Sequence, residues 1–233
     1  MNIAKELVKL FLPVPARRFL KEQYHEANFR AAMKKFIKDP VAALSPGSGV
    51  IGRLIRGWGN EGWSTGDEYA VASMKHALEC DGDILECGSG LSTIMLGVLA
   101  EKRGKKIWSL EHHAGLGKRV QANLDRYGLH SVSLCVAPLK DYGGYSWYDP
   151  PLNAMPQFFS LVICDGPPGE TRGGRYGMVP VIRKKLKNGS VILLDDGARE
   201  GEQAVARRWS DELGAPFHMH GTEKPYIRLV VPE

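Results

Sequence analysis

The chain has 233 residues, 43% of them hydrophobic, and a formal net charge of +5. This length is sufficient for one domain of ordinary size with an appended segment. The four cysteines form no CxxC pair, which argues against a zinc site and favours a reducing, cytoplasmic location. No apolar run approaches the roughly 20 residues of a membrane-spanning helix. The charged start, with Glu6 and Lys9, is not typical of a signal peptide.

The positive charge is concentrated in the first 38 residues, which carry nine Lys and Arg against three Asp and Glu. The remaining residues are nearly neutral, with 22 basic and 23 acidic side chains. The spacing of Ile3, Leu7, Leu10 and Phe11 predicts a helix with one apolar face. We therefore expect a basic helical extension over residues 1–64. Contact of residues 1–21 with an anionic membrane is one interpretation, and packing against its own domain is the more common one.

Residues 39–63 are rich in Pro and Gly, which predicts a linker or a mobile cover. Thr65 stands three residues before Glu68, the spacing of a capping box, and predicts a helix over residues 69–78. Beyond it, apolar runs alternate with amphipathic segments. We expect strands at 84–87, 107–111, 132–137, 158–165 and 190–195, and helices near 91–102, 115–127, 176–186 and 199–213.

Alternating strands and helices predict right-handed crossovers and a doubly wound α/β architecture with a parallel sheet. The end of the chain differs, because residues 216–220 and 226–231 are two strand-like segments joined by a short turn. Strands joined so closely must run antiparallel. The sequence therefore predicts a parallel sheet over residues 65–233 that finishes in an antiparallel hairpin.

The most informative segment is residues 84–93. A short apolar strand ends here in Glu86, and a loop with Gly88 and Gly90 leads into a helix. The next strand ends in a second carboxylate, Glu111. Doubly wound sheets hold nucleosides in this way, because the glycines let the backbone approach the ligand and the second acid binds the ribose hydroxyls. The acid directly before the loop favours S-adenosylmethionine (SAM) over a dinucleotide.

This order of elements resembles the class I SAM-dependent methyltransferases over residues 65–232. The resemblance implies a seven-stranded Rossmann-like sheet, parallel except for one antiparallel strand in a C-terminal hairpin, with SAM as the cofactor. It also implies a set of cofactor-binding residues: Glu86, Gly88, Ser89, Gly90, Ser92, Glu111, His112, Ala137, Pro138 and Asp165. Ser92 replaces the third glycine of the family's loop, and a small hydroxyl side chain still permits close packing.

Three carboxylates follow the fourth and fifth strands of the predicted sheet: Asp165, Asp195 and Asp196. Carboxylates gathered at strand ends repel one another unless something neutralises them, and a hard cation such as Mg²⁺ would do so. The arrangement is similar to the metal-dependent O-methyltransferases related to catechol O-methyltransferase. That similarity implies all three as metal ligands, with the metal lowering the pKa of the acceptor hydroxyl. One alternative is that Asp165 and Asp195 cap the following helices, and another is that one of these two orients the acceptor without a metal.

The resemblance implies methyl transfer by in-line displacement, which depends on holding donor and acceptor at near-attack distance. We expect the acceptor to be a hydroxyl oxygen of a small molecule or a sugar. Asp165 and Asp195 are the expected catalytic residues, with His218 as a candidate base. The near-neutral domain argues against a nucleic-acid acceptor. The oligomeric state cannot be read from the sequence.

Residues 141–157 interleave aromatic rings with Gly and Pro in the place of a crossover helix. We expect a loop that forms a partial lid over the donor or acceptor, and the alternative is a loop anchored on the sheet by its rings.

Three other functions remain open. A methyltransferase-like domain without activity would bind a partner through its basic extension. An NAD-dependent oxidoreductase has a similar loop, but its motif requires a third glycine at the position of Thr93. Residues 62–66 match the G-x-S-x-G motif of serine hydrolases around Ser64, but no strand precedes them.

Overall fold

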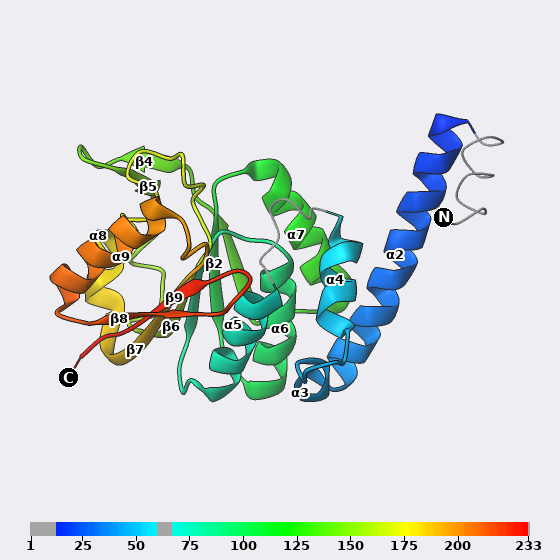
Figure 1. Ribbon diagram of the computed structural model, residues 1–233, viewed down its shortest axis with the longest axis horizontal. Helices are drawn as coiled ribbons and strands as arrows, with labels where there is room; N and C mark the ends of the chain where they lie inside the picture. The colour runs from blue at the N-terminus through cyan, green and yellow to red at the C-terminus, as the bar shows by residue number, and fades with distance from the viewer. Residues whose placement is uncertain (1–12, 60–66, 233) are drawn as a thin grey trace. The chain divides into compact units, whose positions relative to one another are not determined.

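The computed structural model describes residues 13–59 and 67–232, and the chain divides into two compact units, residues 1–64 and 65–233 (Figure 1). Three sequence-based expectations fall outside the described residues: the apolar face from Ile3 to Phe11, the capping residue Thr65 and the hydrolase-like Ser64. No helix within the described ranges is both long enough and apolar enough to cross a membrane.

The N-terminal unit is built on the long helix α2 (Val14–Lys38). Asp39 follows it, and the Asp39 carboxylate accepts a hydrogen bond from the amide of Ala42 and so caps the short helix α3 (Pro40–Ala43). Helix α4 (Val50–Trp58) then packs against α2. The prediction of a linker over residues 39–63 is therefore wrong for the part that is described, since two helices lie there.

Helix α4 forms because its apolar residues repeat at helical spacing and bury one face. Ile51, Leu54 and Trp58 are all buried, and the Trp58 ring centroid lies 5.9 Å from that of Phe29 on α2. Gly57 allows the close approach of the two helices, because an added Cβ would stand 2.7 Å from the Cβ of Phe29. The Gly residues that suggested a linker thus mark helix ends and a helix–helix contact.

The C-terminal unit contains a seven-stranded sheet of order β3-β2-β1-β6-β7-β9-β8. Its strands are β1 (Ile84–Cys87), β2 (Ile107–Glu111), β3 (Val132–Val136), β6 (Phe159–Cys164), β7 (Leu186–Leu194), β8 (Phe217–His220) and β9 (Tyr226–Val230). Strand β9 runs antiparallel to both neighbours, and the other pairs are parallel. The predicted doubly wound, Rossmann-like sheet with one antiparallel strand in its final hairpin is confirmed.

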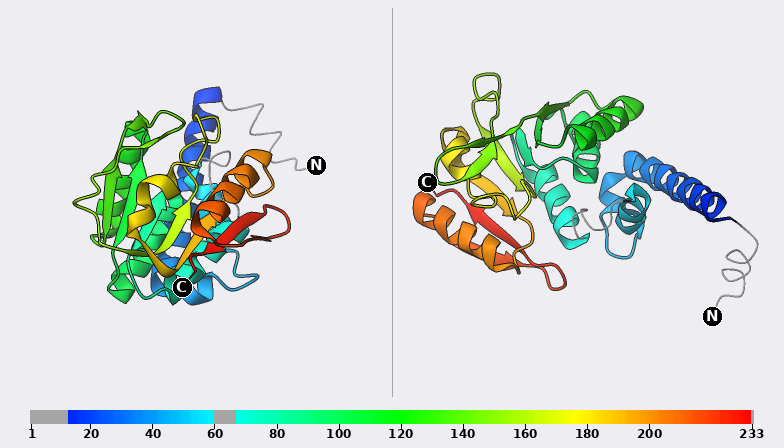
Figure 2. Two further views of the ribbon diagram at one scale, coloured as in Figure 1. Left: turned by 90° about the vertical axis from the view of Figure 1, so that its left-hand side faces the viewer. Right: turned by 90° about the horizontal axis from the view of Figure 1, so that it is seen from above.

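Helices cover both faces of this sheet (Figures 1 and 2). One face carries α5 (Asp67–Glu79), α6 (Leu91–Arg103) and α7 (Ala114–Tyr127), and the opposite face carries α8 (Met178–Ile182) and α9 (Glu200–Leu213). Central strands covered on both faces are apolar along most of their length, and β6 is buried at every position. This burial explains why the strands were readable as continuous apolar runs.

The helix predicted at residues 176–186 is shorter in the structure. Helix α8 ends at Ile182, one 3₁₀ turn follows, and β7 begins at Leu186 rather than at residue 190. The Ser190 hydroxyl explains the longer strand, because it donates to the main-chain oxygen of Phe159 and accepts from the amide of Lys187. It therefore connects the early part of β7 with β6.

The aromatic segment forms a hairpin of β4 (Leu139–Asp141) and β5 (Ser146–Tyr148) instead of a loop. The side chains of Trp147 and Tyr148 are fully buried in the core. These two rings anchor the segment on the domain. For Trp147 and Tyr148, the alternative of anchoring rings therefore holds, and the expectation of a lid does not.

Glu68 of α5 holds the turn of the C-terminal hairpin. Its carboxylate accepts hydrogen bonds from the amides of Thr222, Glu223 and Lys224 at 2.9–3.2 Å and from the Thr222 hydroxyl at 2.9 Å. The Lys224 amide is the largest cause that lowers the pKa of Glu68, followed by the bonds from Thr222. These bonds connect the start of α5 to residues more than 150 positions later in the chain.

We expect Glu68→Gln to increase hydrogen exchange at these three amides. A carboxyl whose pKa is lowered by folding stabilises the folded state at pH values above its unfolded pKa. This stabilisation is lost as pH falls through the folded pKa, so the protection of these amides in wild type should also fall in acid. Protection factors from mass spectrometry or NMR would measure both effects. Glu223→Gln is the control, because no such bonds join that side chain to the described residues, and equal protection in the two variants would contradict the prediction.

Candidate functional site

The glycine loop after β1 passes close to the end of β6. Gly88 has φ of +93°, and an added Cβ would stand 2.9 Å from the amide nitrogen of Gly166. The Gly166 amide donates to the main-chain oxygen of Cys87 at 2.7 Å, which ties the two strand ends together. At Gly90 an added Cβ would meet no heavy atom within 4 Å. The loop is thus closed on its inner side and leaves open space at Gly90, as a cradle for a ligand requires.

Glu86, directly before the loop, is fully buried. The hydroxyls of Thr93 and Ser109 each donate to Oε2 at 2.6 Å, whereas Oε1 has no hydrogen-bond partner among the described residues. Burial raises the pKa of Glu86 to about 7, and the nearby hydroxyls of Ser109, Ser92 and Thr93 oppose the rise. A buried acceptor oxygen that lacks a partner fits an N–H donor on a bound ligand. The role of Thr93 and Ser109 was not predicted.

Because folding raises the pKa of Glu86 from 4.5 to about 7, the folded chain holds this proton more tightly than the unfolded chain. The stability of the ligand-free protein should therefore fall as pH rises through that window. We expect Glu86→Gln to remove this pH dependence, because glutamine does not titrate. The free energy of unfolding of the variant minus that of wild type should therefore be about 2–3 kcal/mol larger at pH 8 than at pH 5. Urea unfolding at both pH values measures this difference. The surface variant Glu101→Gln should show no comparable change, and parallel pH profiles for Glu86→Gln and wild type would refute the prediction.

Glu111, the last residue of β2, is in direct contact with the glycine loop. Its Oε2 accepts from the amide and the hydroxyl of Ser89 at 3.1 and 2.8 Å, and its Oε1 accepts from the amide of His113 at 2.6 Å. Nδ1 of His112 lies 3.3 Å from Oε1. Carboxylate oxygens accept more than one hydrogen bond each, so this group retains capacity for ligand hydroxyls. The structure therefore brings together Ser89, Glu111 and His112, three residues of the predicted cofactor-binding set.

The residues after β3 complete this edge of the sheet. Ala137 is buried, and its amide donates to the main-chain oxygen of Glu111 at 2.7 Å. Pro138 is exposed, and its carbonyl accepts from the amide of Asp149 at 3.0 Å. Both lie at the carboxyl ends of the parallel strands, where an open α/β sheet binds ligands.

The three predicted acids meet at the next two strand ends. Cys164 of β6 pairs with Leu194 of β7, so the residues that follow these strands lie side by side. One carboxylate oxygen from each of Asp165, Asp195 and Asp196 lies within 4.8 Å of the others. We call these three residues the acidic cluster.

A buried arginine that the sequence did not reveal lies within this cluster. The side chain of Arg175 is only 3% exposed, and its Nη2 donates to Asp165 Oδ1 at 3.2 Å and to Asp196 Oδ2 at 3.0 Å. Its Nη1 donates to the main-chain oxygen of Asp195 at 2.8 Å and lies 3.8 Å from Glu202 Oε1. The signal available in the sequence was an arginine in the glycine-rich segment ten residues after Asp165.

Burial dominates the electrostatics of the cluster. It raises the pKa of Asp165 well above its ordinary range, opposed by Arg175 and reinforced by the neighbouring carboxylates. Burial and then Asp196 raise the pKa of Asp195, whose Oδ1 is buried without a hydrogen-bond partner in the described part of the chain. Arg199 adds a second cation, with Nη1 at 2.8 Å from Asp196 Oδ2. Two arginines and these raised pKa values limit the net negative charge.

The type of donor would suit Mg²⁺, since carboxylate oxygens are its usual protein ligands. However, Arg175 already binds one oxygen of Asp165 and one of Asp196, and Arg199 binds the same oxygen of Asp196. A metal that joined these oxygens would compete for the same lone pairs and place two positive charges beside a buried guanidinium. The residues, as arranged, do not fit a divalent metal, and no catalytic step is assigned to one.

His218 does not join the cluster. It lies exposed on β8, opposite Arg228 of β9, which in turn pairs with Leu193 of β7. Two strand spacings of about 4.8 Å place it roughly 10 Å from β7. No hydrogen bond or ion pair of the described residues connects it to Asp165 or Asp195, so its role as a base stays a prediction without geometric support.

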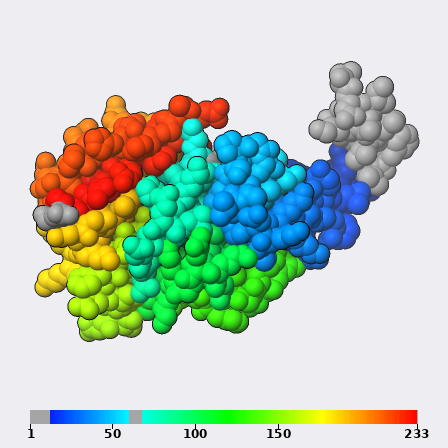
Figure 3. All heavy atoms as spheres, turned by 90° about the horizontal axis from the view of Figure 1, so that it is seen from below, coloured from blue at the N-terminus to red at the C-terminus, as the bar shows by residue number. Residues whose placement is uncertain are grey.

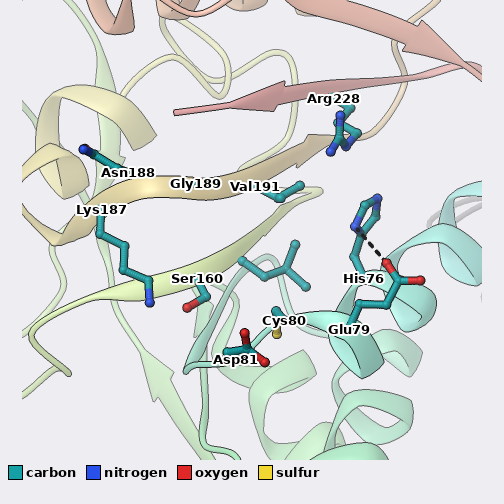
Figure 4. Close-up of a pocket in the computed structure, with 11 residues that line it drawn as sticks. His76, Glu79, Cys80, Asp81, Ser160, Lys187, Asn188, Gly189, Val191 and Arg228 are labelled. Carbon is teal, nitrogen blue, oxygen red and sulfur yellow. Dashed lines mark ion pairs between the residues drawn. The ribbon is translucent and has the colours of Figure 1, made fainter. Parts of the chain in front are cut away.

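A separate hollow of about 380 Å³ lies at the opposite, amino ends of β6 and β7. Figure 3 shows this side of the molecule, where α5 in teal, β7 in yellow and β9 in red adjoin. The hollow is lined by charges of both signs, among them Glu79, Asp81, Lys187 and Arg228 (Figure 4). None of the predicted cofactor or catalytic residues lines it, so it is distinct from the candidate site.

Solved methyltransferase structures share this fold. A "putative caffeoyl-CoA O-methyltransferase" from Staphylococcus aureus superposes with a TM-score of 0.58 at 11% identity, over 84% of this chain and 98% of that one. A precorrin-6Y C5,15-methyltransferase from Geobacter metallireducens gives a TM-score of 0.51 at 14% identity, over 75% and 96%. No family model matches the sequence, and no curated protein matches it. At these identities the likeness is one of fold, and the chain has the fold of the class I SAM-dependent methyltransferases.

Proposed function

We propose that this chain is a SAM-dependent methyltransferase whose acceptor is a hydroxyl oxygen of a small molecule or a sugar. The observation that carries the proposal is the cradle at the glycine loop. Gly88 lies against Gly166, the buried Oε1 of Glu86 has no hydrogen-bond partner among the described residues, and an added Cβ at Gly90 would meet no heavy atom within 4 Å. The O-methyltransferase description of one neighbour in fold supports an oxygen acceptor.

The residues of the loop and the strand ends would divide the binding of SAM between them. Glu86 Oε1 would accept from the ammonium of the amino-acid end, with Gly88, Ser89, Gly90 and Ser92 around it. Glu111 would accept from the ribose hydroxyls, with His112 beside it. Ala137 and Pro138 would flank the adenine, and Asp165 would border the amino-acid end. When bound, SAM supplies an electrophilic methyl group on a sulfonium.

Asp165 and Asp195 would organise the acceptor. The transfer is an in-line displacement, so holding the acceptor oxygen at near-attack distance supplies much of the rate. Asp195 Oδ1 is buried and without a hydrogen-bond partner in the described residues, so it is able to accept the hydrogen bond of the hydroxyl and then its proton as the oxygen attacks. Its raised pKa suits a group that takes up a proton.

Two measurements test the function. Calorimetric titration of S-adenosylhomocysteine (SAH) into the full chain should show binding, and labelled methyl transfer from SAM should then be screened against phenols and sugars. Absence of SAH binding would overturn the proposal and leave a non-catalytic binding module as the better account. Binding without transfer to any hydroxyl compound, but with transfer to amines, would replace the acceptor class.

We expect Glu111→Ala to weaken SAH binding by about 1–3 kcal/mol, because it removes the proposed acceptor for two ribose hydroxyls. Glu101→Ala is the matched control, since this surface carboxylate lies at the far end of α6 and accepts a hydrogen bond from the amide of Ser131, which is outside the site. Calorimetry on both variants measures the effect. An affinity of Glu111→Ala equal to that of wild type would remove the assignment to ribose.

The membrane contact of residues 1–21 and the cytoplasmic location stay predictions. Residues 1–12 lie outside the described ranges, and the first turns of α2 expose apolar side chains next to basic ones: Val14, Arg17, Arg18, Phe19, Leu20 and Lys21.

A further inference from the structure

We propose that the guanidinium of Arg175 is the resident cation of the acidic cluster, and that this site organises its acceptor without a divalent metal. The inference rests on the proposed function, because the acidic cluster is the part of the site assigned to the acceptor. It departs from the metal-dependent branch that the same three carboxylates resemble.

The first argument is burial. Arg175 is almost completely withdrawn from solvent, and its charge is compensated by the carboxylates of Asp165 and Asp196, with Glu202 nearby. These partners come from three separate segments, namely the ends of β6 and β7 and the first turn of α9. A side chain held from three directions is part of the site rather than a surface arm that has settled on it.

The second argument is that the segment carrying Arg175 is fixed in place. An added Cβ at Gly173 would stand 2.7 Å from the Cβ of Tyr145, and one at Gly177 would overlap the Cβ of Trp147. The carbonyl of Tyr176 accepts the indole N–H of Trp209 at 2.8 Å. Close packing on both sides of Arg175 prevents the segment from moving aside to admit a metal.

The third argument concerns the oxygens. Nη2 of Arg175 bonds to both Asp165 Oδ1 and Asp196 Oδ2, and the latter also accepts from Arg199. Asp195 differs, because it binds Arg175 only through its main-chain oxygen and keeps its carboxylate Oδ1 without a partner within the described chain. Arg175 is thus a positioning residue that holds two carboxylates and leaves the third for the acceptor.

Titration of the full chain with Mn²⁺, followed by electron paramagnetic resonance, tests the proposal without requiring turnover. Wild type should leave Mn²⁺ free. Arg175→Met, which uncovers three carboxylates of suitable spacing, should bind one Mn²⁺ at least about tenfold more tightly than wild type, and Arg175→Lys should restore the exclusion. SAH binding on the same samples reports whether each variant is folded and tests the proposed function separately.

The proposal is overturned if wild type binds one Mn²⁺ and Asp196→Asn abolishes that binding. This comparison decides the question even where Arg175→Met does not fold. Mn²⁺ binding that Asp196→Asn leaves unchanged lies elsewhere and agrees with the proposal. A folded Arg175→Met protein that still leaves Mn²⁺ free would show that the guanidinium is not what excludes the metal. Loss of SAH binding alone would overturn the methyltransferase function and leave the assignment of the cation intact.

Discussion

Replacement of Arg175 by methionine should lower the free energy of unfolding by about 3–5 kcal/mol, the usual cost of removing one partner from a buried ion pair. The methionine side chain fills much of the volume but leaves Asp165 and Asp196 without their buried donor. Arg172→Met is the matched control, because Arg172 pairs with Asp141 and both side chains are about 60% exposed. An exposed pair of this kind contributes about 0–1 kcal/mol.

Urea unfolding near pH 7 measures both variants, and a second series at lower pH examines the cause. Burial raises the pKa of Asp165, which Arg175 binds, so this carboxyl takes up a proton as pH falls and then no longer requires a neighbouring cation. The loss caused by Arg175→Met should therefore diminish in acid. A loss no larger than that of Arg172→Met, or one that is independent of pH, would mean that Arg175 does not neutralise the cluster.

Gly88→Ala should reduce SAH affinity about 100-fold or more, equivalent to about 2.7 kcal/mol. It should also destabilise the ligand-free fold by about 1–3 kcal/mol, because φ of +93° is strained for alanine. The obstacle to the new methyl group is the backbone of Gly166, which cannot rotate away as a side chain would. If these strand ends separated, both Glu86 and Asp165 would be displaced from their positions in the site.

Gly90→Ala is the companion variant that separates the fold from the ligand. Its φ of 176° is ordinary extended backbone, and the added Cβ meets nothing within 4 Å. We expect thermal unfolding of the ligand-free protein close to that of wild type, and SAH affinity lowered about tenfold because the methyl group enters the space of the ligand. Wild-type SAH affinity in Gly90→Ala would contradict the placement of the ligand over this loop.

The sequence by itself determined the sheet and the positions of the residues that we assign to the nucleoside. Apolar runs of strand length alternate with amphipathic helices, and this local pattern has few compact solutions because crossovers are right-handed and parallel strands must be covered on both faces. Residues at the ends of β1 and β2 are neighbours in any such sheet. Glu86, Gly88 and Glu111 could therefore be placed from their positions in the chain alone.

The tertiary structure alone decided how the acidic cluster is neutralised. Repulsion among Asp165, Asp195 and Asp196 predicts that a cation is present but does not identify it, because a metal and a guanidinium satisfy the same charge requirement. Arg175 is selected by the packing of its glycine-rich segment against Trp147 and Trp209, contacts between residues far apart in the chain. A contact between residues far apart in the chain also explains α4. Gly57 packs against Phe29 of α2, so a Gly-rich segment that suggested a linker is part of a helix.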